Sequence, residues 1–285
     1  MKRQKNVLSN NDMTMDIVKR NFFRLLRCGA LSDMEELEPM SLFKWKKLVE
    51  LVIFKKTEAV TTAAITEYSE RQPDVMKANV VEMFRSNNVF NDNQGTISLP
   101  EANMSNFLLN RRLGKIREKE LHSIDTSIET LNALNIILYN VYLLLNSGLS
   151  FNAILCLGKY MRTRGDKIDF VKLESWLAKL HMQRMAQLEV SVLITYFGFE
   201  KDELPFTRRI CHEAKNVMAR ALSKNAANDA EDMRFWEGKS GFVSGDAGAL
   251  RHKIWTAMRF MSFAPVEASS NFIRNLANSL AKIEE

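Results

Sequence analysis

The segment from Leu131 to Phe206 constrains the fold more than any other part of the chain, because its apolar residues recur with a nearly unbroken helical period. It is interrupted at Asn146-Ser147-Gly148, Arg164-Gly165-Asp166 and Gly198. These breaks predict helices near residues 150–163, 169–182 and 184–197, with Asp169 capping the second. No run alternates with period two for long enough to form a sheet. We therefore predict a mainly α protein, a multi-helix bundle with little or no β-sheet.

Composition agrees with a helical protein whose surface carries both signs of charge. The 285 residues include only 11 Gly and 5 Pro, and 40 basic residues stand against 34 acidic ones. Three separated cysteines, Cys28, Cys156 and Cys211, have apolar neighbours, which predicts reduced thiols and a cytoplasmic location. The most apolar run, Ile136 to Leu145, is half as long as the roughly 20 residues of a membrane span. We therefore expect no contact with a membrane.

Loop-forming residues divide the chain into parts. We predict a mobile basic tail over 1–11, an N-terminal helical subdomain over 12–86 and an Asn-rich loop over 87–100. A C-terminal helical bundle then covers 101–285, with a flexible loop near 224–249. Four single residues are expected to mark helix ends: Gly29 closes the first helix, Ser41 caps the second, and Pro73 and Pro205 each open one.

Sequence patterns for catalysis and metal binding are missing. The histidines, His122, His181, His212 and His252, show no metal-ligand spacing, and Cys211 beside His212 fits a buried thiol on a helix better than a nucleophile. Gly238-Lys239-Ser240 ends like a phosphate loop, but Met233 occupies the place of the required glycine. We predict no catalytic residue, no metal ligand and no cofactor. Lys239 is kept as a candidate for binding an anion.

A basic stretch supplies the remaining candidates for binding an anion or a partner. Its members are Arg111, Arg112, Lys115 and Lys119, and the last three share one helical face. Glu118 and Glu120 are mixed in, which is also the pattern of a solvated face. A nucleic-acid-binding module that uses this stretch together with Lys2 to Lys5 is one alternative for the function.

Two blocks of the chain resemble a family of uncharacterised bacterial nucleotidyltransferases, in which a helical body surrounds a small catalytic palm. The first block is Asn21 to Val60, with Phe22-Phe23-Arg24-Leu25-Leu26-Arg27 and Phe43-Lys44-Trp45. The second contains Gly148-Leu149-Ser150-Phe151, Lys167-Ile168-Asp169-Phe170, Tyr196-Phe197-Gly198-Phe199 and Leu204-Pro205. Together they cover roughly half the chain. The resemblance implies a helical body and, for an active member, Mg²⁺ and a nucleoside triphosphate.

The chain departs from this family where the chemistry would be. A palm needs a Gly-Ser turn and an Asp-x-Asp pair to hold Mg²⁺ against the triphosphate, and the sequence has no Asp-x-Asp. Asn152 and Cys156 also stand where the family has Arg and Asp. We therefore expect a non-catalytic binding or scaffold protein, a pseudoenzyme with a protein partner.

The alternative is an active nucleotidyltransferase with carboxylates at atypical positions. The substitutes for the missing pair are Glu36-x-Glu38, Glu118-x-Glu120, and Asp92 or Glu118 combined with Asp125.

Overall fold

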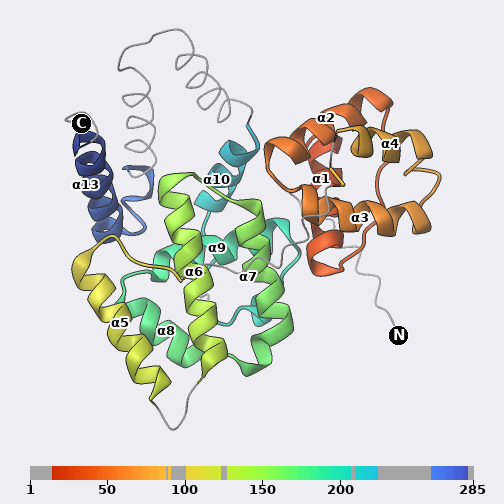
Figure 1. The fold of residues 1–285 in the computed structure, drawn as a ribbon. Coiled ribbons are helices and arrows are strands. Elements are labelled where there is room, and N and C mark those ends of the chain that lie inside the picture. The colour runs from red at the N-terminus through yellow and green to blue at the C-terminus, as the bar shows by residue number, and fades with distance from the viewer. Residues whose placement is uncertain are drawn as a thin grey trace. The chain divides into compact units, whose positions relative to one another are not determined.

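The computed structural model describes residues 15–87, 89–90, 101–122, 127–206, 209–223 and 258–281. Every regular element in these ranges is helical, and none of them contains a strand (Figure 1). The prediction of a mainly α fold is thus confirmed. The α-helices are α1 (Ile17–Leu31), α2 (Leu42–Phe54), α3 (Glu58–Arg71), α4 (Ala78–Ser86), α5 (Phe107–Leu121), α6 (Ile128–Asn146), α7 (Phe151–Arg164), α8 (Phe170–Lys179), α9 (Gln183–Tyr196), α10 (Glu213–Leu222) and α13 (Pro265–Ala281). Short 3-10 turns occur at Gly165–Lys167 and Lys201–Glu203.

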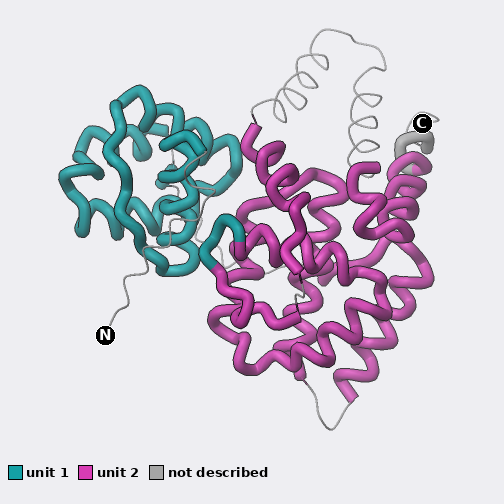
Figure 2. Tube along the Cα trace, turned by 180° about the vertical axis from the view of Figure 1, so that it is seen from behind, with its two compact units in different colours: residues 1–98, 195–198 teal, residues 99–194, 199–285 magenta. Residues whose placement is uncertain are grey.

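The chain forms two compact units (Figure 2). Unit 1 comprises residues 1–98 and 195–198, and unit 2 comprises 99–194 and 199–285. The division near residue 98 lies within the segment 87–100 that the sequence marks as a boundary. The inclusion of 195–198 in unit 1 is a tertiary effect: the ring of Phe23 lies 5.4 Å from that of Tyr196 and 5.5 Å from that of Phe197.

Unit 1 is built on a close approach of α1 to α3. Phe22, Leu25 and Leu26 of α1 are fully buried, as their spacing predicts. Gly29 does not end this helix, which continues to Leu31 and ends where Ser32 adopts a positive φ of 55°. Instead, a Cβ at Gly29 would lie 1.9 Å from the carbonyl oxygen of Val60. The glycine is therefore needed for helix packing rather than for the turn.

Unit 2 is built around α6, which packs against α5, α7 and α8. By length and composition alone α6 would suffice to cross a membrane, but 56% of its most apolar window is buried inside the structure. The core helix of a soluble protein passes the same test. The helices packed around α6 begin with side-chain caps, such as Asp169, whose carboxylate accepts a bond from Lys172 N–H (2.8 Å).

Two helix starts predicted from proline are wrong. The helix expected from Pro73 begins at Ala78 (α4), and the helix expected from Pro205 begins at Glu213 (α10). Both prolines lie in turns. A φ near −65° suits the first turn of a helix and also a β-turn, so proline alone does not separate the two. Ser41 does precede α2, but its side chain makes no capping bond. The predicted tail 1–11 and the loop 224–249 lie outside the described residues.

Candidate binding surface on α5

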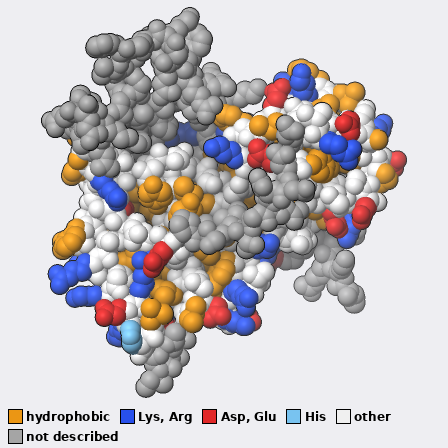
Figure 3. Space-filling model, in the orientation of Figure 1, with side chains coloured by type: hydrophobic (Ala, Val, Ile, Leu, Met, Phe, Trp, Pro, Cys, Tyr) orange, Lys and Arg blue, Asp and Glu red, His pale blue; other side chains and the backbone are white. Residues whose placement is uncertain are grey.

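The four basic side chains singled out in the sequence lie together on the exposed side of α5. Arg111, Arg112, Lys115 and Lys119 are all exposed, and one carboxylate, Glu118, lies among them, so the face carries a net charge of +3. Figure 3 shows Lys and Arg side chains gathered over this helix. The fifth candidate, Lys239, lies outside the described residues.

Three large apolar side chains accompany these cations on α5. Phe107, Leu108 and Leu121 are 76%, 62% and 63% exposed. Sequence reasoning missed them because apolar residues were assigned to the core by default. The helical phase was the available signal: Leu109 and Leu113 are buried, and Leu108, one residue before Leu109, points about 100° away from it. The face is therefore cationic and apolar at once.

The N-terminal end of α5 is held by α13. The buried carboxylate of Glu267 accepts hydrogen bonds from the backbone N–H groups of Ser105 and Asn106, and Asn106 Nδ2 donates to Ser270 Oγ (2.9 Å). The side chain of Asn106 also caps the helix by accepting from Leu109 N–H (3.0 Å). Carboxylates at a helix N-terminus are favoured by the helix dipole and by otherwise unpaired N–H groups.

The C-terminal half of α5 is held in the same way. The carboxylate of Glu120, which is 5% exposed, accepts from Ser127 N–H (2.7 Å) and from Lys172 Nζ (3.0 Å). Nearer the start of the helix, Arg112 Nη1 donates to the carbonyl oxygen of Lys179 (3.1 Å) and lies 3.4 Å from His181 Nε2. With both ends fixed, α5 presents its exposed face as a preorganised surface, which lowers the entropic cost of binding a partner.

The candidate carboxylate pairs do not form metal sites in the described parts of the chain. Glu118 is exposed, whereas Glu120 is buried and paired with Lys172. Glu36 is exposed, whereas Glu38 accepts bonds from Arg20 and Arg24. Asp92 and Asp125 lie outside the described residues. No group of three His, Cys, Asp or Glu side chains suited to a metal ion occurs within the described ranges.

Glu38, on the surface of unit 1, is bound by two arginine side chains. Its carboxylate accepts from Arg20 Nε (2.7 Å), Arg20 Nη2 (2.6 Å) and Arg24 Nη1 (2.7 Å), and Arg27 binds the neighbouring Glu35 (2.6 Å). The hydrogen bonds from Arg20, with the charge of Arg24, lower the pKa of Glu38 to about 2. The acidic connection after α1 is thereby fastened to that helix.

Glu189 is a buried carboxylate whose pKa is shifted. It lies in α9, is 1% exposed, and accepts one bond from Asn140 Nδ2 of α6 (3.1 Å). Within the described residues, Glu189 Oε1 and Asn140 Oδ1 have no hydrogen-bond partner. Burial raises the pKa of Glu189 well above its ordinary 4.5, which favours the neutral form. At 1% exposure this carboxyl is closed to a substrate in the described structure.

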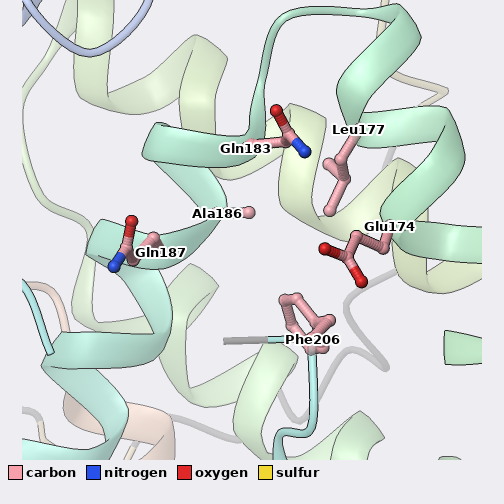
Figure 4. Close-up of a pocket in the computed structure, with 6 residues that line it drawn as sticks. All are labelled: Glu174, Leu177, Gln183, Ala186, Gln187 and Phe206. Carbon is pink, nitrogen blue, oxygen red and sulfur yellow. The ribbon is translucent and has the colours of Figure 1, made fainter. Parts of the chain in front are cut away.

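A depression in the described structure lies between α8 and α9 (Figure 4). It has a volume of about 130 Å³ and is lined by Glu174, Leu177, Gln183, Ala186, Gln187 and Phe206. Sites for drug-sized ligands usually occupy about 300–1,000 Å³, so this depression is small for a nucleotide. Its lining supplies one carboxylate, Glu174, whereas a palm needs a pair.

The cysteines have the character of unreactive thiols. None of the three forms a disulfide. Burial raises the pKa of Cys28 and of Cys211 to about 11, and burial also raises the pKa of Cys156. Because the thiolate is the nucleophile and the metal ligand, these shifts disfavour both roles. The thiol of Cys211 donates to Glu213 (2.8 Å).

Comparison of the chain with models of protein families, with curated proteins and with solved structures gave no match. The resemblance to nucleotidyltransferases therefore rests on the sequence blocks described above.

Proposed function

We propose that this chain is a non-catalytic helical binding protein, and that the exposed face of α5 docks an acidic protein surface. The observation that carries the proposal is the composition of that face. Four cations and three large apolar side chains lie on one helix that is anchored at both ends. Charge complementarity would set the orientation of the partner and speed its association, and the apolar side chains would supply contact area.

The residue types favour a protein over a nucleic acid as the partner. Arginine and aromatic side chains such as Phe107 are enriched in protein interfaces, and the buried centre of an interface is more apolar than its rim. Phosphate backbones need cations, and exposed leucines such as Leu108 and Leu121 add little to them. Only Phe107 among the three apolar side chains could stack on a base. A protein partner could contact both the cations and the exposed apolar side chains of α5.

A site-specific photo-crosslinker at Leu108 tests this surface in the native host. We expect one discrete protein adduct, identified by mass spectrometry and reproduced with the purified partner. The adduct should be lost when Arg111, Arg112, Lys115 and Lys119 are all replaced by Glu. Exposed Glu70 on α3 is the matched control position. An adduct that disappears with nuclease, or the same adducts from both positions, would contradict the proposal.

Titration calorimetry tests the non-catalytic part separately. ATP, CTP, GTP and UTP, each with Mg²⁺, should give no saturable heat with the full chain. Saturable binding of any one of them would overturn this part and revive the nucleotidyltransferase alternative, while leaving the crosslinking result to stand by itself.

A further inference from the structure

Unit 1 has a second exposed face of mixed character, on α2. This helix buries Trp45, Leu48, Val49 and Val52 and turns four large apolar side chains outward. These are Leu42, Phe43, Ile53 and Phe54, with exposed fractions of 51%, 67%, 37% and 40%. Single exposed apolar residues are common on protein surfaces. Four on one 13-residue helix are typical of a surface that binds something.

Lysines surround these apolar side chains. Lys44, Lys46, Lys47 and Lys56 are exposed and Lys55 is half-buried, against one carboxylate, Glu50, which gives this stretch a net charge of +4. No arginine occurs between residues 41 and 56. Hydrophobic and basic side chains are visible beside one another at this edge of unit 1 (Figure 3).

The lysines and the aromatic rings are paired in space. Lys47 Nζ lies 4.6 Å from the centroid of the Phe43 ring, and Lys55 Nζ lies 3.9 Å from the centroid of the Phe54 ring. Phe43, Lys47, Glu50 and Phe54 follow the spacing i, i+4, i+7 and i+11, so they form one line along the helix. In each pair a compact ammonium lies next to an apolar ring.

This pairing fits a lipid surface better than a protein surface. Lysine is depleted from protein interfaces. Helices that lie in the plane of a bilayer combine Lys with Phe and Leu, because the rings enter the boundary between headgroups and acyl chains while the ammonium groups reach the phosphates. The five lysines provide charge complementarity to anionic headgroups.

We infer that α2 is a docking surface for the anionic face of a lipid bilayer. The helix, about 20 Å long, lies parallel to the membrane. Phe43 and Phe54, together with Leu42 and Ile53, enter the interface, and the lysines contact lipid phosphates. This is adsorption rather than spanning, and it departs from the expectation of no membrane contact, which was based on the search for a spanning segment. It is independent of the function proposed for α5.

Flotation of the full chain with vesicles tests the inference. Phosphatidylcholine vesicles with about 30% phosphatidylserine should bind the chain, whereas vesicles of phosphatidylcholine alone should not, and high salt should weaken binding. Replacing Lys44, Lys46 and Lys47 by Glu should reduce binding at least tenfold, since each lysine near an anionic surface contributes roughly fivefold. Phe43→Ser with Phe54→Ser should also reduce it severalfold, with helix content unchanged by circular dichroism.

A charge reversal of the same size on α5 shows whether vesicle binding depends on the α2 residues or only on the total positive charge of the chain. Replacing Arg111, Arg112 and Lys115 by Glu removes as much charge and should leave vesicle binding within about twofold of the wild type, because the α2 residues that contact the bilayer are unchanged and salt screens charges outside that contact. The inference would be overturned by an absence of binding to anionic vesicles at low salt. Equal losses from the two reversals, or no loss from the phenylalanine variant, would overturn it as well.

Discussion

The exposed faces of α2 in unit 1 and α5 in unit 2 are similar in net charge and different in chemistry. The α2 face combines phenylalanine rings with lysines and has no arginine, whereas the α5 face combines Phe107 and two leucines with Arg111 and Arg112 as well as Lys115 and Lys119. Arginine forms planar, directional hydrogen bonds to carboxylates, whereas lysine is a hydrated point charge on a flexible apolar stem. This difference is the basis for proposing different partners for two faces of nearly equal charge, a protein surface for α5 and a lipid surface for α2.

The two units also hold a carboxylate in opposite ways, one at the surface of unit 1 and one in the interior of unit 2. Unit 1 surrounds Glu38 with arginines and lowers its pKa to about 2, whereas unit 2 buries Glu189 beside a single amide and raises its pKa. Glu38 is a partly exposed carboxylate in the connection after α1, whose charged form is favoured by its arginine partners, whereas Glu189 is a buried carboxylate of α9, whose neutral form is favoured by burial. Their partners, rather than their residue type, determine what each does for stability.

Glycine substitutions give the largest expected contrast between the units. Gly29→Ala should lower the free energy of unfolding by about 2–3 kcal/mol, because its Cβ would collide with the backbone carbonyl of Val60. Gly114→Ala on α5 meets no atom within 4 Å and should raise stability by about 0.5–1 kcal/mol through helix propensity. Urea unfolding measures both, and equal effects would contradict the packing described for α1 and α3.

Replacement of the buried carboxyl should stabilise unit 2 at neutral pH. Because the folded state raises the pKa of Glu189, the unfolded state gains stability as its own carboxyl ionises above about 4.5. Glu189→Gln removes this penalty and should raise the free energy of unfolding by about 1–3 kcal/mol at pH 7. The gain should disappear as the pH falls to 4, and an effect of the same size at both pH values would show that folding does not raise the pKa of Glu189.

The corresponding change in unit 1 should have the opposite sign. Glu38→Gln should cost about 1–2 kcal/mol at pH 7, because the charged form is bound by Arg20 and Arg24 at a partly exposed site. Since the folded state lowers the pKa to about 2, this contribution is complete above about 4.5 and is lost as the pH falls toward 2. Thermal unfolding at several pH values measures it, and a loss that does not depend on pH would contradict the ionic account.

Charge reversal on α5 should have the smallest effect on stability. Exposed charges away from buried networks contribute little, so Lys115→Glu with Lys119→Glu should change the free energy of unfolding by less than about 0.5 kcal/mol. Arg117→Ala is the matched contrast on the same helix, because this arginine pairs with Glu101 (3.1 Å) and donates to Ala102 O (2.6 Å). A larger loss from the exposed pair would show that the face is structural.

Helical period and capping residues gave most of the fold from sequence. Helices α7, α8 and α9 begin and end within three residues of their predicted limits, since Asp169 and the breaks after α6 and α7 act locally. Proline and glycine were less informative. Each of these residues is compatible with several backbone conformations, and tertiary packing determines which one forms at Pro73, Pro205 and Gly29.

The candidate site could be predicted only in part. The cations of α5 were found because charge on one helical face is a sequence property. The exposure of Leu108 and Leu121 was not found, because it depends on which face of α5 is covered by the rest of unit 2. The buried pair of Asn140 and Glu189 was missed for the same reason, since these residues are 49 positions apart in sequence.

The yield of the Leu108 crosslink in three chains tests the central claim most directly. It is measured in the wild type, in the variant with Lys44, Lys46 and Lys47 replaced by Glu, and in the variant with Arg111, Arg112 and Lys115 replaced by Glu. If α5 is a protein-binding face distinct from α2, the adduct forms in the first two chains and is lost in the third. Equal loss in both variants, or no discrete protein adduct in the wild type, would contradict that account.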